Sequence, residues 1–534
     1  RPFQRRHLQP GEVPLSGLAD RIGTALDRAL SVLAPGLALR RAESRIRFGM
    51  AATMYKAADP ETMDRMGWWR TGADRKATPN AWERMSLRDV SRHLIRNNAV
   101  AAGAQDTIAL NVVGQGLRPQ SRLRADRLGI SPARAAELQR QAEDVWDEWC
   151  GHADATGSLH FDDLQFLALL KIVEDGEVLA LPTWADEPWR PWGRCLEFVE
   201  ADRLRKPGGR KDVPESGIEV GSRGQPLRYW IESGRKSARG TEFFGVDARD
   251  DKGRPRVLHL FRPRRPGQSR GIPLFSSVIT RFANLDDFVE AELMAARVAA
   301  CLAVFVTQND PLAGAASARL AADPGQDNRP RVQSLSPAMI AYMKQGESIN
   351  VVDPKRPGDA FVPFVESMLR FIGMALGLPY ELLVKDFSKT NYSSARAALL
   401  EGRRMFSNWR SWLPRQLNQP IWELVLEEAW LRGRFEAGDF HGFKAEYCRA
   451  VWIGGGWGWV DPVKEVQSST QAVAGNLSTL ADECAAQGRD WEEVLAQRKR
   501  EEDLRRELGL AEPSMSRTAP PKTPDGDADE EDRV

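Results

Sequence analysis

The chain contains few of the residues that build metal sites and disulfide frameworks. Its six histidines form no cluster, and no two of its five cysteines are spaced as a Cys-x-x-Cys pair. The cysteines are Cys150, Cys195, Cys301, Cys448 and Cys484. Structural zinc sites and disulfide-rich secreted domains show closely spaced Cys or His residues. The pattern therefore predicts no metal, no cofactor and no disulfide framework, as is typical of proteins from a reducing cytoplasm.

The phosphate-binding and catalytic motifs of common enzyme classes are also missing. The sequence has no G-x-x-x-x-G-K-[ST] loop, no G-x-G-x-x-G after a strand and no H-E-x-x-H. The first two surround phosphates with backbone N–H groups, and the third holds zinc on one face of a helix. We therefore expect no ATP hydrolysis and no other enzyme activity.

One catalytic pattern is present at Gly267-Gln268-Ser269-Arg270-Gly271, which fits the G-x-S-x-G nucleophile elbow of hydrolases. That elbow needs a buried strand directly before it and a histidine later in the chain. Residues 261–266 are rich in arginine and proline, which is unlike a core strand, and His441 is the single histidine downstream. A hydrolase using Ser269 is therefore an alternative hypothesis, and a basic loop before a long helix is the favoured interpretation.

The chain also lacks an excess of either charge and any long apolar run. Lys and Arg number 75 against 74 Asp and Glu, a formal net charge of +1. Strong non-specific DNA binding needs a cationic field, so any DNA contact must be local or weak. No apolar run reaches the roughly 20 residues of a membrane span, and we expect no membrane partner. Residues 1–47 mix nine arginines with four acidic residues, which is not a signal peptide.

Hydrophobic spacing predicts a mixed α+β fold with two to four domains. Helices are expected at 18–34, 85–112, 130–150, 158–173, 275–306, 361–376, 393–430 and, as a hairpin, 462–509. Strands are expected at 178–182, 196–200, 217–220, 227–231 and 257–261. Pro414 and Pro420 should kink the helix at 393–430. Residues 452–459 should form a loop.

The long helix expected at 275–306 and the tryptophans bear on assembly. Val278, Phe282, Leu285, Val289 and Leu293 recur at steps of three and four, which predicts one apolar stripe on the helix at 275–306. The 17 tryptophans are a high number for this length. Because tryptophan is common at interfaces, they indicate extensive subunit contacts, although weakly.

Two loops are candidate functional sites. Arg262, Arg264, Arg265 and Arg270 predict a local basic patch, which either contacts DNA or a partner or is a solvated loop or subunit salt-bridge site. The polar segment 386–396 contains Asp386, Ser388, Lys389, Asn391 and Tyr392. It is either a loop exposed to a channel or a capping loop in which Ser393 or Ser394 holds the free N–H groups of the next helix.

Several sequence blocks, in this order and spacing, resemble the lambda-type portal proteins of tailed bacteriophages over roughly residues 40–505. The blocks are residues 85–118, Trp146–Trp149, Asp175–Glu177, Glu200–Leu204, Gly217–Glu219, His259–Phe261, Arg265–Pro273, Glu290–Leu293, Asp386–Ser388, Asn391–Arg396 and Asp461–Glu465. The G-x-S-x-G pattern falls inside one of these blocks, which weakens the hydrolase hypothesis further.

The resemblance implies a ring-forming portal architecture with a mixed α/β wing, a helical stem, a small clip and a helical crown. It implies an N-terminal arm at 1–44, a wing at 45–274, stem helices at 275–306 and 361–379, and a clip at 307–360. It further implies a tunnel loop at 380–394, a kinked helix with the second part of the wing at 395–460, and a crown at 461–509. Residues 510–534 are acidic and should form a disordered tail.

The function implied by the resemblance is structural. Such a subunit would form a dodecameric ring at one vertex of the capsid in the virion, after assembly in the host cytoplasm. Double-stranded DNA would pass through the ring during packaging and ejection. The implied partners are further copies of the chain, the terminase large subunit, the major capsid protein and a head-completion or adaptor protein. The portal of a gene-transfer particle is a second hypothesis from the same resemblance.

Overall fold

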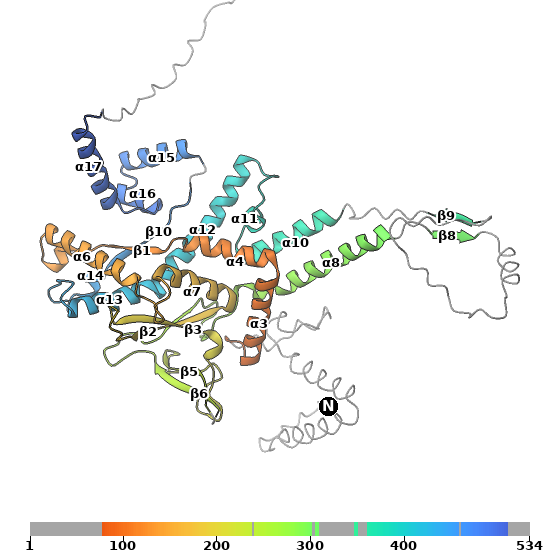
Figure 1. Cartoon of the computed structure of the whole chain (residues 1–534), viewed down its shortest axis with the longest axis horizontal. Coiled ribbons are helices and arrows are strands. Elements are labelled where there is room, and N and C mark those ends of the chain that lie inside the picture. Colours follow the sequence, from red (N-terminus) through yellow and green to blue (C-terminus); the bar gives the residue numbers. More distant parts are fainter. Residues whose placement is uncertain are drawn as a thin grey trace, which may run out of the picture. The chain divides into compact units, whose positions relative to one another are not determined.

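Helices and short antiparallel sheets make up the chain in a computed structural model that describes residues 77–237, 240–301, 305–308, 347–350, 360–458 and 461–510 (Figure 1). The mixture of helix and strand confirms the α+β fold class. The chain divides into two compact units. Unit 2 consists of Arg118–Gln120 and the chain from Val451 onward, and unit 1 is the remainder. The expected helix at 18–34, the N-terminal arm and the tail beyond residue 510 lie outside the described residues.

The first helical stretch of unit 1 is two helices, α3 (Ala81–Asn97) and α4 (Ala99–Val112), where a single helix was expected. Asn98 separates them because its side-chain oxygen accepts hydrogen bonds from the backbone N–H groups of Val100 and Ala101, both at 3.0 Å. An asparagine that caps a helix in this way favours a new helix start over continuation. The small-residue face of α4 is buried as expected, including Ala101 and Ala104.

The short helix α5 (Ala125–Leu128), which has no buried residue, precedes a tryptophan-rich core built by α6 (Pro132–Cys150), α7 (Phe161–Asp175) and the later helix α13 (Asn418–Leu431). The ring centroid of Trp146 lies 5.0 Å from those of Trp149 and Phe161 and 5.4 Å from that of Trp422. Aromatic groups at these separations stabilise a core beyond their buried area. These tryptophans therefore fill the interior of one chain, whereas Trp184 and Trp189 are exposed.

Two three-stranded antiparallel sheets face each other after α7. The first has the order β3-β2-β7, with β2 at Glu177–Trp184, β3 at Arg194–Glu200 and β7 at Leu258–Phe261. The second has the order β4-β5-β6, with β4 at Ile218–Val220, β5 at Pro226–Ser237 and β6 at Gly240–Asp247. The 3-10 turn η3 (Ala201–Arg203) follows β3. The expected strands are confirmed, and β6 was not anticipated.

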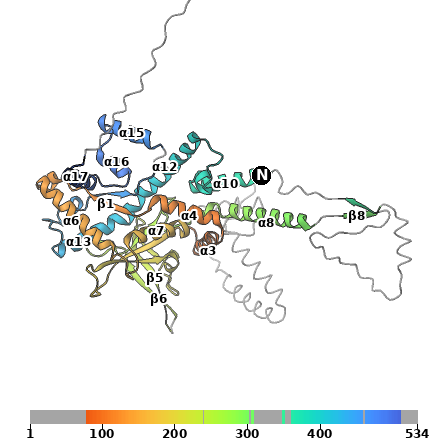
Figure 2. The ribbon, with the colours of Figure 1, turned by 45° about the horizontal axis from the view of Figure 1, so that its top comes forward.

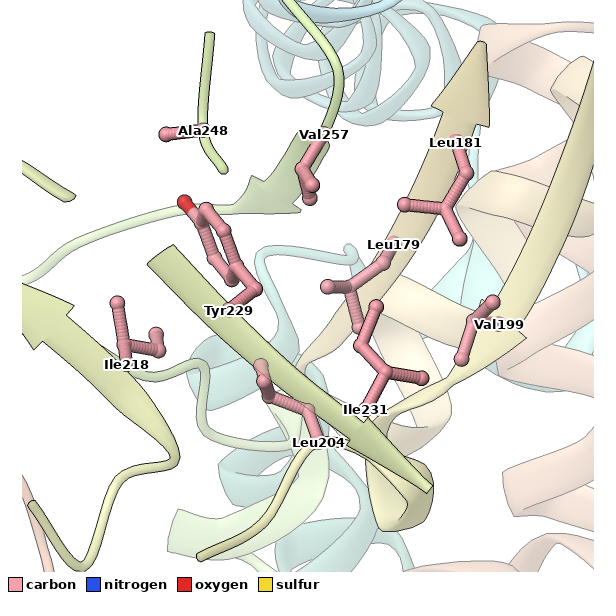
Figure 3. Close-up of a cluster of buried hydrophobic side chains, with 9 residues drawn as sticks. All are labelled: Leu179, Leu181, Val199, Leu204, Ile218, Tyr229, Ile231, Ala248 and Val257. Atoms are coloured by element: carbon pink, nitrogen blue, oxygen red, sulfur yellow. The ribbon is translucent and has the colours of Figure 1, made fainter. Parts of the chain in front are cut away.

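A compact apolar cluster joins the two sheets (Figure 3). Leu179 and Leu181 of β2 and Val199 of β3 point toward Tyr229 and Ile231 of β5. Leu204, Ile218, Ala248 and Val257 complete the cluster from the connecting segments and β4. Alternate residues of β2 and β5 supply it because successive strand side chains point to opposite faces.

A buried ionic cluster lies at the beginning of β2, on either side of Gly176. Arg270, which is 1% exposed, donates from Nε to Glu177 Oε1 at 2.8 Å. The backbone N–H of Gly271 and the Nε2 of His259 reach the same carboxylate at 2.6 and 2.9 Å. Burial alone would raise the pKa of Glu177, but the Arg270 charge and the His259 hydrogen bond outweigh it and hold the pKa well below its usual range.

Helix α3 extends this cluster because its arginines recur every four residues along one face. Arg92 donates from Nε and Nη2 to the two oxygens of Asp175 at 2.7 Å each. Arg88 pairs with Asp202 at 2.9 Å and lies 3.5 Å from Glu177. The residues of separate sequence blocks thus meet in one network that ties α3 to both β2 and η3.

Two glycines permit the close approach of chain segments that this network requires. A Cβ on Gly176, whose φ is +87°, would lie 2.2 Å from the backbone carbon of Ile272. A Cβ on Gly271 would lie 2.2 Å from the carbonyl oxygen of Gly176. No side chain fits in either place, so glycine at both positions is a packing requirement.

The long helical pair comes next. The turn η4 (Leu274–Ser277) leads into α8 (Ile279–Cys301), and α10 spans Phe361–Leu376 as expected. The prediction that α8 continues to residue 306 was wrong, because Phe305–Gln308 is the strand β8, paired antiparallel with β9 (Glu347–Asn350). The β-branched and aromatic run Phe305-Val306-Thr307 favours a strand over a helix. The rest of the expected clip at 307–360 lies outside the described residues.

The remaining helices of unit 1 are α11 (Tyr380–Val384), α12 (Tyr392–Gln416), α13 and α14 (Lys444–Tyr447). The predicted kinked helix is interrupted completely at Leu417, between α12 and α13. Pro414 lies inside α12 and Pro420 in the first turn of α13, where its missing N–H costs no helix hydrogen bond.

Unit 2 begins with a two-stranded sheet and continues with three helices. The strands are β1 (Leu117–Ser121) and β10 (Ala450–Gly454), so part of the loop expected at 452–459 is a strand. The helices are α15 (Pro462–Ala474), α16 (Leu480–Ala486) and α17 (Trp491–Glu507), where a two-helix hairpin was expected. Asp461, Thr479 and Asp490 cap them, and the Gln120 side chain of β1 donates to Asp490.

Replacing Glu177 with glutamine should strongly destabilise unit 1, because Arg270 would stay buried without a counter-charge. We expect a loss of about 3–5 kcal/mol in the free energy of unfolding, measured by urea denaturation followed by tryptophan fluorescence. Glu200→Gln is the matched control, since that exposed carboxylate lies 3.8 Å from Lys171 and should contribute less than about 1 kcal/mol. Equal effects of the two substitutions would contradict a central role for Glu177.

The same carboxylate predicts how stability depends on pH. The pKa of Glu177 is depressed in the folded chain, so its contribution is complete above the unfolded pKa of about 4.3 and is lost as the pH falls below it. One such group changes the free energy of unfolding by up to about 1.4 kcal/mol per pH unit. Between pH 5 and pH 3, the free energy of unfolding should therefore fall less steeply with decreasing pH for Glu177→Gln than for the wild type. The same pH dependence of the free energy of unfolding in both proteins would show that the pKa of Glu177 is not lowered by folding.

Candidate channel loop, basic loop and helix-pair surface

The polar loop between α11 and α12 is a short, internally hydrogen-bonded connection. Lys385, with φ of +57°, ends α11 in the left-handed region. Asp386 Oδ1 accepts from the backbone N–H of Ser388 at 2.9 Å, and hydrogen bonding with Ser388 lowers the pKa of Asp386. Asn391 caps α12 by accepting from the N–H of Ser394 at 2.8 Å. The prediction that Ser393 or Ser394 provides this cap was therefore wrong.

Lys389, one of the two lysines of this loop, is paired within the chain. Its ammonium group donates to Glu366 on α10, which also accepts from Arg370 at 3.4 Å. The hydrogen bond with Glu366 raises the pKa of Lys389 and lowers that of Glu366. Tyr392, at the start of α12, is exposed, as is Phe387. The loop therefore presents polar and aromatic side chains, while Lys389 is hydrogen-bonded to Glu366 of α10.

The four arginines expected to form one basic patch occupy different environments. Arg262 lies over the rings of Trp409 and Trp412, at 4.4 and 5.8 Å, and donates to Asn408 at 2.6 Å. Burial lowers the pKa of Arg262. Arg264 and Arg265 are exposed.

Arg270 belongs to the interior and not to this surface. It is bound to Glu177 and donates to the carbonyl oxygens of Leu204 and Ser216 at 2.8 and 2.6 Å. A buried guanidinium with all these partners has no face toward solvent. The four-residue patch therefore reduces to Arg264 and Arg265, with Arg262 partly covered at its edge.

Ser269 of the G-x-S-x-G pattern has no geometry for nucleophilic catalysis. Its hydroxyl lies 3.4 Å from that of Thr78, and its backbone N–H donates to Thr78 at 2.9 Å. His259 is bonded to Glu177, and His441 packs against the ring of Trp430. A catalytic serine needs a base within hydrogen-bond reach, and neither histidine is bonded to Ser269. The favoured interpretation, a loop before a long helix, describes the segment.

The described residues offer neither a metal site nor a membrane-spanning helix. Within the described ranges, no three His, Cys, Asp or Glu side chains are grouped closely enough to hold a metal ion. Likewise, none of the helices that the structure describes combines the length and apolar character of a membrane-spanning segment.

Helices α8 and α10 lie side by side as an antiparallel pair (Figures 1 and 2), and both expose large apolar side chains. Phe288 of α8 packs against Phe361 and Phe364 of α10, with ring centroids 5.7 and 4.5 Å apart. Arg281 lies over the ring of Phe371 at 4.9 Å. These contacts join α10 to the first half of α8.

The apolar stripe predicted for α8 is buried in its first half and exposed in its second. Val278, Phe282 and Leu285 are buried, whereas Val289 and Leu293 are exposed. Other large apolar side chains exposed on the pair are Met294, Val362, Phe364, Phe371 and Met374, the last 74% exposed. Several large apolar side chains exposed on one helix pair are typical of a protein–protein contact. The sequence identified the stripe, but Val289 and Leu293 in its second half are not covered by any part of the chain that the structure describes.

The chain is similar to known portal proteins along most of its length. Residues 62–410 match the family described as phage portal protein, lambda family. The portal protein of Escherichia phage N15 is 27% identical over 457 residues, which cover 80% of this chain and 85% of that protein. Portal protein B of Escherichia phage lambda is 26% identical over 456 residues, with the same coverage.

Among solved structures, the neck of a native gene transfer agent particle contains a similar chain. The match has a TM-score of 0.41 and 14% identity, and it covers 76% of this chain and 93% of that one. A TM-score at this level is too low to support a conclusion about function. The family match, by contrast, spans well over half of the sequence and includes the buried ionic cluster, α8, α10 and the channel loop. This chain therefore belongs to the lambda family of phage portal proteins.

Proposed function

We propose that this chain is the subunit of a dodecameric portal ring that occupies one vertex of a phage capsid. The observation that carries this proposal is the exposed apolar surface of α8 and α10 in a chain of the lambda portal family. The ring is the channel for double-stranded DNA during packaging and ejection and has no catalytic activity of its own. The terminase large subunit, the major capsid protein and a head-completion protein are its partners in assembly.

Rotational assembly accounts for the position of the apolar side chains. In a closed ring each subunit contacts two neighbours through two different surfaces. The exposed residues Val289, Leu293 and Met294 lie on α8, and Phe371 and Met374 lie on α10. Two helices that pack against each other and still expose large apolar groups have surface left for a neighbour on each side. These helices form the stem in the proposed architecture.

The charge distribution suits DNA that slides instead of binding tightly. The chain carries a net charge of +1, and Lys389 of the channel loop is already paired with Glu366. Phosphate contacts by free lysines would add affinity that opposes movement. The polar and aromatic side chains of residues 386–392 therefore touch the duplex transiently, and Arg264 and Arg265 supply local positive charge on unit 1.

The relatives favour a phage over a gene-transfer particle as the source of the assembly. The matching family and both relatives described above are phage portal proteins. The assembly forms in the host cytoplasm and remains in the virion. In the same architecture, unit 1 provides the wing and stem, and α15 to α17 provide the crown.

Disrupting the exposed stem surface should prevent ring formation without unfolding the chain. The double substitution Leu293→Glu and Met374→Glu introduces charge at positions that are exposed in the single subunit, so the circular dichroism spectrum should be unchanged. Negative-stain electron microscopy should show rings with a central hole for the wild type and single subunits for the variant. Val220→Glu, at an exposed position of β4, is the control and should retain rings. If the double variant formed rings in the same yield as the wild type, the stem would not be the subunit contact.

A bulky group on the channel loop should block DNA passage if the loop lines the channel. Ser388→Cys, made in a Cys484→Ser background and labelled with a maleimide polymer, should reduce packaged, nuclease-protected DNA at least tenfold in a packaging reaction with the cognate terminase. Lys211→Cys carrying the same label, at an exposed site of unit 1, should package normally. Normal packaging by the Ser388 conjugate would place the loop away from the DNA.

A further inference from the structure

The helices that the structure describes in unit 2 have no hydrophobic core of their own. None of the described residues between Asp461 and Leu510 is buried, whereas α4, α6, α7 and α13 of unit 1 each have seven or more buried residues. Leu477 is 87% exposed and Val463 is 77% exposed. The other large apolar groups exposed on this unit are Val466, Leu480, Leu495, Leu504, Leu508 and Leu510.

Local interactions set where α15, α16 and α17 begin, but they do not by themselves stabilise these helices. Asp461, Thr479 and Asp490 each accept a hydrogen bond from the first turn of their helix. Strands β1 and β10 pair, and Gln120 of β1 donates to Asp490, which fixes the start of α17. Helices of this length are nevertheless marginal in water unless an apolar face is buried against another element. Unit 2 therefore requires a surface that covers its leucines and valines.

The charges of unit 2 argue against a nucleic acid as that covering surface. Residues 461–510 contain eleven Asp and Glu against seven Lys and Arg. A net negative segment is repelled by phosphates and gains nothing from counterion release. The covering surface must instead combine apolar groups with charges of both signs.

A second copy of unit 2 has such a surface. Helix α17 carries its charges in alternating blocks, which are Glu492-Glu493, Arg498-Lys499-Arg500, Glu501-Glu502-Asp503 and Arg505-Arg506. Its ion pairs within the helix, Arg498 with Glu502 at 3.4 Å and Arg506 with Asp503 at 3.0 Å, are on exposed side chains. Positive blocks of one copy can therefore lie against negative blocks of another, and the leucines between them can be buried together.

The apolar residues are also distributed as a ring requires. They lie on α15, between α15 and α16, at the first position of α16, on α17 and directly after α17. Helices α16 and α17 pack as a pair, and α15 precedes them in unit 2 (Figures 1 and 2). A single partner would cover one continuous patch, whereas neighbours on two sides would cover both α15 and α17.

We propose that unit 2 obtains its hydrophobic core between copies, so that α15 and α17 of each subunit are buried against unit 2 of its neighbours and this unit is stably folded only in the assembled ring. This inference rests on the ring of the proposed function. It adds that one part of the ring folds through assembly, while unit 1 folds within each chain.

Hydrogen–deuterium exchange of the full chain tests this proposal. Backbone amides of 462–507 should exchange at least about tenfold more slowly in wild-type rings than in the ring-defective Leu293→Glu/Met374→Glu subunit, whereas amides of α6 and α7 should be protected equally in both. Slow exchange depends on the free energy of local opening, so the difference reports folding of unit 2 directly.

A triple substitution, Leu495→Glu, Leu504→Glu and Leu508→Glu, provides the specific variant. These positions are exposed in the single subunit, so its thermal unfolding should be unchanged, but the protection of α15 to α17 in rings should be lost. Leu431→Glu is the control because Leu431 is an exposed leucine at the end of α13 in unit 1. It should leave the exchange of unit 2 in rings unchanged.

The possible outcomes separate this inference from the proposed function. Absence of wild-type rings would overturn the proposed function and this inference with it. Rings in which 462–507 exchange rapidly would overturn the inference alone. Equal protection in rings and in the single subunit would also overturn it, because the chain's own surface would then cover unit 2.

Discussion

The buried contact between Glu177 and Arg270 is the interaction on which unit 1 depends. Two opposite charges without solvent are stable only when hydrogen bonds satisfy nearly every polar atom of both. Arg270 therefore recruits carbonyl groups around η3 and β4, and Glu177 recruits His259 and the N–H of Gly271. Elements that are far apart in the sequence must come together to meet that requirement. The pair thus determines which arrangement of α3, the first sheet and the segment before α8 is acceptable.

Apolar side chains are buried in some segments of this chain and exposed in others. The tryptophan core and the cluster between the sheets are complete within one copy. The second half of the α8 stripe, the outer surface of α10 and all of 461–510 are not. A single subunit therefore completes the cores of its largest part, while the apolar side chains of these described segments stay exposed.

The sequence predicted features that depend on local chemistry and missed those that depend on distant partners. Ser131 before Pro132 correctly predicted the start of α6, because a cap acts within one helical turn. Asn98 was read as part of a helix, since hydrophobic spacing continues across it although its side chain caps a new one. The burial of Arg270 and the pairing of Lys389 were inaccessible for another reason. Each depends on a carboxylate from a separate element, and a single sequence does not show which elements meet.

The pairing of β1 with β10 places an early strand of the chain in the same small sheet as a late one. A ribosome adding about 5–20 residues per second would leave β1 without its partner for tens of seconds during synthesis. Throughout that time the strand is an open edge able to pair with other chains. The order in which this protein emerges therefore leaves the edge of β1 without its native partner until Ala450–Gly454 has been synthesised.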